Sequence, residues 1–172
     1  EISECLVGSE MCIRDRHKVL IINGSPRENG NTSVAVSEVA KTLRNDGIEP
    51  LVVRIGSDNI RGCIACGYCL KNGKCVFNDK VNELSKIFEE VDGLIVASPV
   101  YYASANATLI ATLDRLFYSS HFDMRFKVGA SIVVARRGGC SSTFDELNKY
   151  FTISGMPVAV SYTHLRAHET LA

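Results

Sequence analysis

Fold and candidate site are both decided by one stretch near the start of the chain, Lys18-Val19-Leu20-Ile21-Ile22-Asn23-Gly24-Ser25-Pro26-Arg27-Glu28-Asn29-Gly30-Asn31-Thr32-Ser33. Residues 18–23 contain an apolar run at 19–22 that is rich in β-branched side chains, which is typical of a strand buried on both faces. Residues 31–45 carry apolar side chains at roughly helical spacing, and Gly47 follows their end. The stretch therefore predicts a strand, a glycine-rich loop and a helix in succession.

The same alternation continues along the chain. Further strands are predicted at 50–55, 93–97, 128–135 and 157–160. One helix is predicted after Asn78 or Asp79 and another over 105–118, and a last one starts at a capping box of Thr143 and Glu146. Strict alternation predicts an α/β fold with a doubly wound, five-stranded parallel sheet of order 2-1-3-4-5, covered on both faces.

Composition limits the classes of function. The chain has 172 residues, of which 46% are hydrophobic and 22% charged, and its net charge is zero. These values predict one ordered domain and give no reason to expect nucleic acid or an anionic membrane as a partner. No apolar run reaches the roughly 18 residues needed to cross a bilayer.

The two ends of the chain do not match its middle. Residues 1–17 and 162–172 show no helical or strand periodicity and resemble translated sequencing adaptors. We therefore expect the natural domain to occupy 18–161, with foreign flanks on both sides. Two natural but poorly ordered ends are the alternative.

The loop 24–33 is predicted to bind a phosphate, because it leads into a helix N-terminus and carries hydroxyl side chains. Ligands of a doubly wound sheet bind beyond the carboxyl ends of its strands, where the loops starting at Gly24, Ser98 and Arg136 converge. The spacing does not match the dinucleotide fingerprint Gly-x-Gly-x-x-Gly. Five residues between Gly24 and Gly30, followed by Asn31, also exclude a Walker A loop. A terminal monophosphate remains, such as FMN presents.

Three motifs carry a resemblance to a known family: Asn23-Gly24-Ser25-Pro26-Arg27 with Gly30-Asn31-Thr32, Ser98-Pro99-Val100-Tyr101-Tyr102, and Ala135-Arg136-Arg137-Gly138-Gly139. Over about 18–161 the chain resembles NADPH-dependent FMN reductases, which have a flavodoxin-like fold. The resemblance implies FMN as the cofactor. Relatives continue past the fifth strand with a ring-contacting segment and a final helix. That helix is missing here, so we expect weak flavin binding.

The resemblance also implies which residues contact the flavin. Those expected at the FMN phosphate are Ser25, Arg27, Asn31, Thr32 and Ser33. Those expected beside the isoalloxazine ring are Pro99, Val100, Tyr101 and Tyr102, and those at its polar edge are Arg136, Arg137 and Gly138. The alternatives are core packing for the tyrosine pair and a solvated surface for the two arginines.

Four of the seven cysteines, Cys63, Cys66, Cys69 and Cys75, lie within one short segment. Such clustering favours metal ligation in a reducing, cytoplasmic compartment over disulfides. Four soft ligands suit a 4Fe–4S cluster or a tetrahedral zinc, and free thiols are the third alternative. The spacing resembles the compact motif of iron–sulfur flavoproteins, a branch of the same flavodoxin-like group. In that branch the cluster exchanges electrons with FMN.

Taken together, the resemblance implies an FMN-dependent oxidoreductase that uses NAD(P)H to reduce a quinone, a flavin or a similar acceptor. The alternative is an electron carrier that passes electrons between a 4Fe–4S cluster and FMN, and a third class is a binding module without flavin. No catalytic acid or base is predicted, because flavin chemistry belongs to the cofactor. The resemblance also implies a homodimer. Asp114 and Arg115 are expected on an exposed face or an interface.

Overall fold

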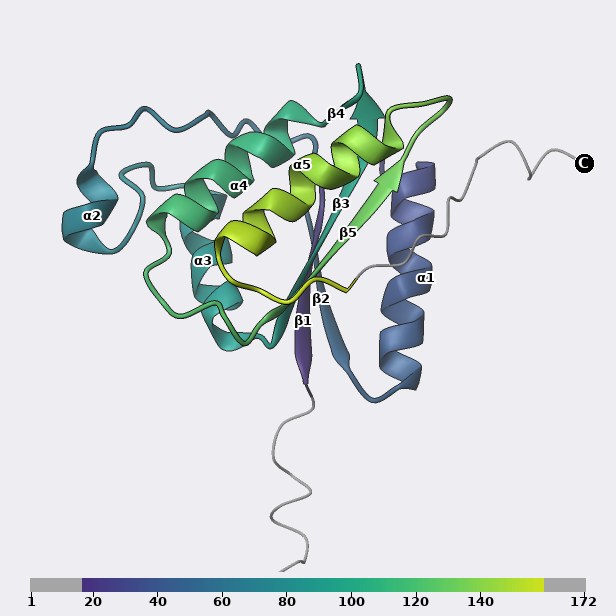
Figure 1. The fold of residues 1–172 in the computed structure, drawn as a ribbon, viewed down its shortest axis with the longest axis horizontal. Helices are drawn as coiled ribbons and strands as arrows, with labels where there is room; N and C mark the ends of the chain where they lie inside the picture. The colour runs from purple at the N-terminus through teal and green to yellow at the C-terminus, as the bar shows by residue number, and fades with distance from the viewer. Residues whose placement is uncertain (1–16, 160–172) are drawn as a thin grey trace, which may run out of the picture.

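The computed structural model describes residues 17–159, which form a parallel sheet with helices on both faces (Figure 1). The strands are β1 (Lys18–Asn23), β2 (Glu49–Arg54), β3 (Gly93–Tyr101), β4 (Ser104–Ala105) and β5 (Val128–Val134). The helices are α1 (Asn31–Asn45), α2 (Tyr68–Asn72), α3 (Lys80–Glu90), α4 (Ala107–Ser119) and α5 (Cys140–Ile153). None of these helices is long and apolar enough to cross a membrane. Apart from His17, the predicted flanks lie outside the described residues, and so does the predicted loss of a final helix.

The strand order confirms the predicted topology. β1 pairs in parallel with β2 on one side and with β3 on the other, and β3 pairs in parallel with β5. The order β2-β1-β3-β5 matches the first four strands of the doubly wound arrangement. The strand predicted at 157–160 is reduced, within the described residues, to one parallel bridge between Val158 and Gly129.

β1 lies at the centre of the core because both of its faces are covered. Leu20, Ile21 and Ile22 are each 0% exposed. Leu20 and Ile22 belong to the larger core cluster, which includes buried side chains of α3, α4 and α5. Ile21 belongs to the second cluster, to which α1 contributes Val36 and Ala40. The alternation follows the two-residue period of a strand and explains why residues 19–22 are all apolar.

β3 is longer than predicted, and the loop expected after it is a hairpin. The strand predicted at 93–97 continues because Ser98 and Pro99 still pair with β5, and the chain then turns back into β4. The turn residues Tyr102 and Ala103 have φ angles of 50° and 60°. Hairpin turns of type I′ need positive φ at both central positions and usually contain Asn or Gly. The Tyr-Ala pair therefore carries no turn signal that sequence reasoning recognises.

The capping box predicted from Thr143 and Glu146 is wrong. α5 begins at Cys140, after Gly139 with a φ of 93°, so Thr143 lies inside the helix and is 0% exposed. A Thr-x-x-Glu spacing caps a helix only where the threonine precedes the first turn. The short helix α2 was not predicted either, because it lies in the segment expected to be a loop.

We expect Leu113→Ala to lower the free energy of unfolding by about 2–5 kcal/mol. Leu113 is 0% exposed and lies in the larger core cluster, so its truncation leaves a cavity between α4 and the sheet. Urea denaturation measures the change. Ile153→Ala is the control, because Ile153 is 85% exposed and its truncation should cost less than about 0.5 kcal/mol. Equal losses in the two variants would contradict this assignment of the core.

Candidate functional site

Three segments meet at one edge of the sheet, where the carboxyl ends of β1, β3 and β5 lie side by side (Figure 1). Gly24, at the start of the loop after β1, donates its backbone N–H to the carbonyl oxygen of Ala97 at 2.8 Å. Ser142 Oγ of α5 donates to the carbonyl oxygen of Ala103 at 2.8 Å. The fold therefore brings together the three loops that the sequence singled out.

Hydroxyl groups stabilise the shape of the first loop. Ser25 Oγ accepts from the backbone N–H of Arg27 and donates to its carbonyl oxygen, both at 3.2 Å. Ser33 Oγ donates to the same carbonyl oxygen and accepts from Asn23 Nδ2, both at 3.1 Å. Asn23 Oδ1 in turn accepts from the backbone N–H of Ser25 at 2.9 Å. Two predicted phosphate contacts, Ser25 and Ser33, thus hold the loop's own backbone. Asn23 was missed, although its Asx-turn position was a usable signal.

The N-terminus of α1 suits an anion. Its N-cap is Gly30, no side chain caps it, and no acidic residue lies in the first turn. First-turn N–H groups and the positive end of the helix dipole favour negative charge there. Thr32 is 3% exposed, whereas Arg27 and Asn31 are exposed beside it.

Two residues near the end of β2 also contact the first loop, and sequence reasoning did not identify them. Gly56 packs so closely that a Cβ at this position would lie 2.2 Å from the carbonyl carbon of Ser25. Arg54 Nη1 donates to the carbonyl oxygen of Pro26 at 3.4 Å, which places a positive charge beside the loop. Both residues lie near the first loop because the parallel pairing of β1 with β2 aligns the carboxyl ends of the two strands.

The hairpin presents its tyrosines to solvent. Tyr101 is 47% exposed and Tyr102 is 107% exposed, so the core-packing alternative is wrong for this pair. Pro99 and Val100 are half-buried. Residues other than glycine at positive φ cost free energy, and they gather at ligand-binding positions. Tyr102 and Ala103 both have positive φ angles of this kind.

The third loop packs on this turn through glycine. A Cβ on Gly139 would lie 2.7 Å from Ala103 Cα. Arg136, Arg137 and Gly138 are exposed. Neither arginine forms an ion pair with another residue of the described range. Two cationic side chains thus remain accessible beside the hairpin.

Glu146 connects α5 to the hairpin. Its carboxylate accepts from Ser104 Oγ at 2.9 Å and from the backbone N–H of Ala105 at 2.8 Å. Asn106 then begins α4, donating its N–H to Ser98 Oγ at 2.9 Å. These contacts fix both ends of the hairpin, which explains how the strained turn between them is maintained.

All four cysteines predicted as metal ligands line one pocket, together with Arg115, Tyr118 and Ser119 of α4. Cys63 and Cys66 are exposed, Cys75 is half-buried, and Cys69 is buried. Every cysteine in the described part of the chain is a free thiol. The spread of the four residues along the segment therefore does not prevent them from sharing one site.

Left-handed backbone conformations curve this segment around the pocket. Gly67 and Gly73, which flank α2, have φ angles of 67° and 65°, as expected from the conformational freedom of glycine. Ala65 also has a positive φ, 52°, and donates its N–H to Cys63 Sγ at 3.4 Å. Gly67 and Gly73 are therefore bending points of the cysteine segment.

The four cysteines are suitable ligands for a metal group, although their sulfur atoms do not lie close together in this conformation. Within residues 17–159, no three His, Cys, Asp or Glu side chains lie close enough together to hold a metal ion. Four thiols in one pocket nevertheless match the number and type of ligands of a 4Fe–4S cluster or a tetrahedral zinc. Binding would require the sulfur atoms to move closer together.

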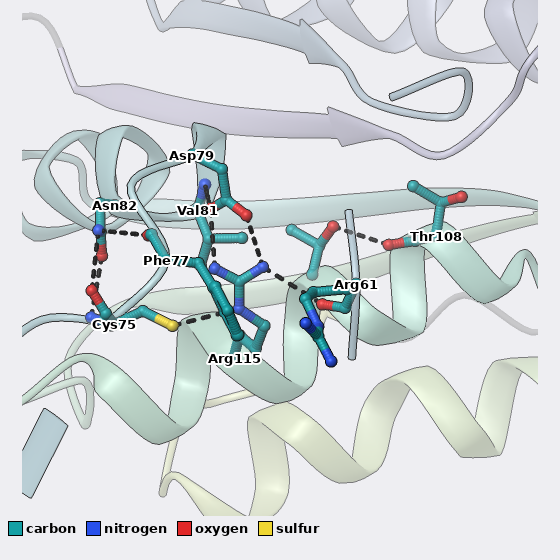
Figure 2. Close-up of polar contacts among 9 residues, drawn as sticks. Arg61, Cys75, Phe77, Asp79, Val81, Asn82, Thr108 and Arg115 are labelled. Carbon is teal, nitrogen blue, oxygen red and sulfur yellow. Dashed lines mark hydrogen bonds and ion pairs between the residues drawn. The ribbon is translucent and has the colours of Figure 1, made fainter. Parts of the chain in front are cut away.

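Cys75 is held at both its backbone and its sulfur (Figure 2). Asn82 of α3 accepts from the backbone N–H of Cys75 at 2.9 Å and donates to its carbonyl oxygen at 3.1 Å. Arg115 Nε of α4 donates to Cys75 Sγ at 3.2 Å. His121 Nε2 lies 3.0 Å from the carbonyl oxygen of Cys69. Side chains of α3 and of the α4 region thus position the cysteine segment.

Arg115 is buried, so its predicted place on an exposed face is wrong. Its side chain is 0% exposed, and Nη1 lies 2.7 Å from Asp79 Oδ2. Nη2 donates to Asp79 Oδ1 at 2.8 Å, and Nη1 donates to the carbonyl oxygen of Arg61 at 3.2 Å. Burial alone would lower the pKa of Arg115, but its hydrogen bonds to Asp79 and Cys75 outweigh burial and raise it. The cation is therefore retained beside the cysteines.

The spacing of polar residues in α4 could have predicted that Arg115 is buried. The helix buries Leu109, Leu113 and Leu116 toward the core, and it also buries Thr112, Arg115 and Ser119. The second set has the spacing i, i+3, i+7, so it forms one helix face. A polar face of this kind next to an apolar one indicates a second buried contact surface.

Comparison with known proteins identifies relatives over most of the chain. The model of the family described as NADPH-dependent FMN reductase matches residues 17–169. An iron-sulfur flavoprotein of Methanocaldococcus jannaschii is 36% identical over 144 residues, covering 82% of this chain and 75% of the relative. One of Methanosarcina thermophila is 32% identical over 151 residues, covering 86% and 79%. One of Archaeoglobus fulgidus is 42% identical over 118 residues, and the match covers 68% of this chain and 54% of that relative.

Solved structures agree on the fold. An NAD(P)H:quinone oxidoreductase from Methanothermobacter marburgensis superposes with a TM-score of 0.68 at 15% identity, covering 86% of this chain and 83% of that one. A flavodoxin from the domain Archaea gives a TM-score of 0.57 at 15% identity, covering 84% and 79%. At these identities the likeness shows a flavodoxin-like fold alone.

We expect Gly56→Ala to weaken FMN binding by roughly tenfold, equivalent to about 1.4 kcal/mol. The new Cβ would meet the backbone of Ser25 and Pro26 within 2.4 Å and so displace the first loop. Fluorescence titration of FMN into the flavin-free protein measures the effect. Gly62→Ala is the control, because a Cβ there meets nothing within 4 Å. Unchanged affinity in Gly56→Ala would show that this loop does not bind the cofactor.

Proposed function

Because the chain belongs to the NADPH-dependent FMN reductase family, we propose that it is a flavin oxidoreductase with two redox centres. FMN binds at the carboxyl edge of the sheet, and a 4Fe–4S cluster binds at the four cysteines. The observation that carries the proposal is the single pocket lined by Cys63, Cys66, Cys69 and Cys75. Relatives at 36% and 32% identity that are named iron-sulfur flavoproteins support it.

The FMN site consists of the three loops described above. Backbone N–H groups at the start of α1, with Ser25, Arg27, Asn31, Thr32 and Ser33, bind the phosphate. Pro99, Val100, Tyr101 and Tyr102 lie along the ring, and Arg136, Arg137 and Gly138 contact its polar edge. The uncapped start of α1 and its lack of acidic residues support this assignment. So does the close approach of Gly56 to the first loop.

The protein's own residues supply position and charge rather than acid or base groups. When bound, FMN accepts a hydride from a nicotinamide, and a 4Fe–4S cluster transfers single electrons. Arg54 and Arg27 add positive charge near the phosphate. Glu146 keeps the hairpin on α5, so that the tyrosines stay at the edge of the site.

Metal and flavin content test the two-centre proposal. After anaerobic purification, the chain should contain FMN together with about four iron atoms and about four acid-labile sulfides. Cys69→Ser should lose iron and sulfide but retain FMN, because its pocket lies apart from the flavin loops. Cys140→Ser, at the start of α5, is the matched control and should keep all three. Zinc without sulfide, or no metal at all, would overturn the cluster assignment.

NAD(P)H oxidation separates the two candidate roles. The family to which the chain belongs favours a reductase that passes electrons from NAD(P)H to a quinone, a flavin or a similar acceptor. The curated relatives are named iron-sulfur flavoproteins, and a cluster together with a flavin suits the alternative role, a carrier that moves electrons between cluster and FMN. With full flavin and cluster content, rapid NAD(P)H oxidation by an artificial acceptor supports the reductase. No oxidation under the same conditions supports the carrier. A homodimer is part of either proposal, and analytical ultracentrifugation tests it.

A further inference from the structure

Helix α4 forms one wall of the cysteine pocket. Arg115 and Ser119, one helical turn apart, both line it together with the four cysteines. Arg115 is 1% exposed and Ser119 is 2% exposed. The rest of the pocket lining includes apolar side chains, with Phe77 and Ile64 among them. Two residues with buried polar side chains therefore lie at the pocket on one packed helix.

Arg115 is held so that only its Nε points to a cysteine (Figure 2). Both terminal nitrogens are occupied by Asp79, at 2.7 and 2.8 Å, and Nη1 also reaches the carbonyl oxygen of Arg61. The Phe77 ring lies 5.0 Å from the guanidinium carbon. With these contacts fixed, the Nε–H donates to Cys75 Sγ at 3.2 Å. Removing this arginine would remove both a hydrogen bond and a positive charge from the sulfur.

Ser119 has a hydroxyl group without a partner. Among the described residues, only two buried side-chain oxygens form no hydrogen bond, Ser119 Oγ and Thr143 Oγ1. A buried, unpaired hydroxyl is costly, so each such group requires an explanation. Ser119 lines the cysteine pocket and Thr143 does not. A group bound among the cysteines would give Ser119 an acceptor.

We propose that Arg115 and Ser119 donate hydrogen bonds to the sulfur atoms of the metal group bound by the cysteines and raise its reduction potential. Arg115 acts through Cys75 and is a positioning residue, whereas Ser119 contacts the bound group itself. The inference rests on the proposed cluster. Hydrogen bonds and positive charge near the sulfurs stabilise the reduced state, which carries more negative charge, and so shift the potential upward.

Ser119→Ala tests the hydroxyl with Thr143→Val as its matched control. Each variant removes one unpaired buried hydroxyl, but only the first lies at the pocket. In the anaerobically purified full chain, Ser119→Ala should give a more negative midpoint potential and faster iron release to a chelator. The metal-free Ser119→Ala chain should unfold at the wild-type temperature or above it. Thr143→Val should leave the potential and the iron release unchanged.

Arg115→Lys and the double variant Asp79→Asn/Arg115→Gln test the guanidinium. The lysine keeps the charge but loses the directed Nε–H, so its midpoint potential should fall less than that of the double variant. Asn at position 79 can still accept from the N–H of Val81, which caps α3. If neither Arg115 variant folds, Ser119→Ala decides the inference.

The outcomes separate this inference from the proposed function. Iron and sulfide in the wild-type chain, with wild-type potential and iron release in Ser119→Ala and Arg115→Lys, would overturn the inference alone. A wild-type chain that binds only zinc or no metal would overturn both. A potential lowered equally by Ser119→Ala and Thr143→Val would mean a general effect of packing, and it would also overturn the inference.

Discussion

The parallel pairing of β1 between β2 and β3 is the constraint on which the rest of the structure depends. Both faces of β1 are buried, so its register with its neighbours cannot shift without exposing Leu20, Ile21 or Ile22. Because all main strands run in the same direction, their carboxyl ends share one edge. This shared edge brings together the first loop, Gly56, the hairpin and the third loop, which carries Arg136 and Arg137. The strand topology therefore determines where the candidate site lies, and the side chains determine what it can bind.

A second constraint holds the cysteine segment, and it depends on an ion pair between buried Arg115 and half-buried Asp79. Asp79 caps α3 through Val81 and also binds both terminal nitrogens of Arg115. Burying charges is expensive, and a buried ion pair is weak evidence for stability in itself. Hydrophobic residues of similar size would pack there as well. What they could not supply is the directed Nε–H to Cys75, which is why a functional role accounts for the pair better than a structural one.

The sequence was informative where local chemistry and tertiary structure agree. The ranges predicted for β1 and α1, 18–23 and 31–45, match the observed elements, because apolar runs and glycine positions determine them locally. The shared pocket of the four cysteines followed from their short spacing. Long-range packing was not visible in the same way. Tyr102 and Ala103 lie in a hairpin that Glu146 and Gly139 contact, and both of these residues are far from the turn in the sequence. Arg115 was likewise expected at the surface, because the sequence does not show that Asp79 lies beside it.

Helix α4 joins the two candidate centres. Its cap residue, Asn106, is bound to Ser98 of the flavin-side strand, and Arg115 borders the cysteine pocket. At 1.5 Å per residue, these two positions lie about 14 Å apart along the helix axis. Leu109, Leu113 and Leu116 bury the same helix against the sheet, so neither end can move without disturbing the core. A helix packed in this way gives the two candidate sites a common rigid support.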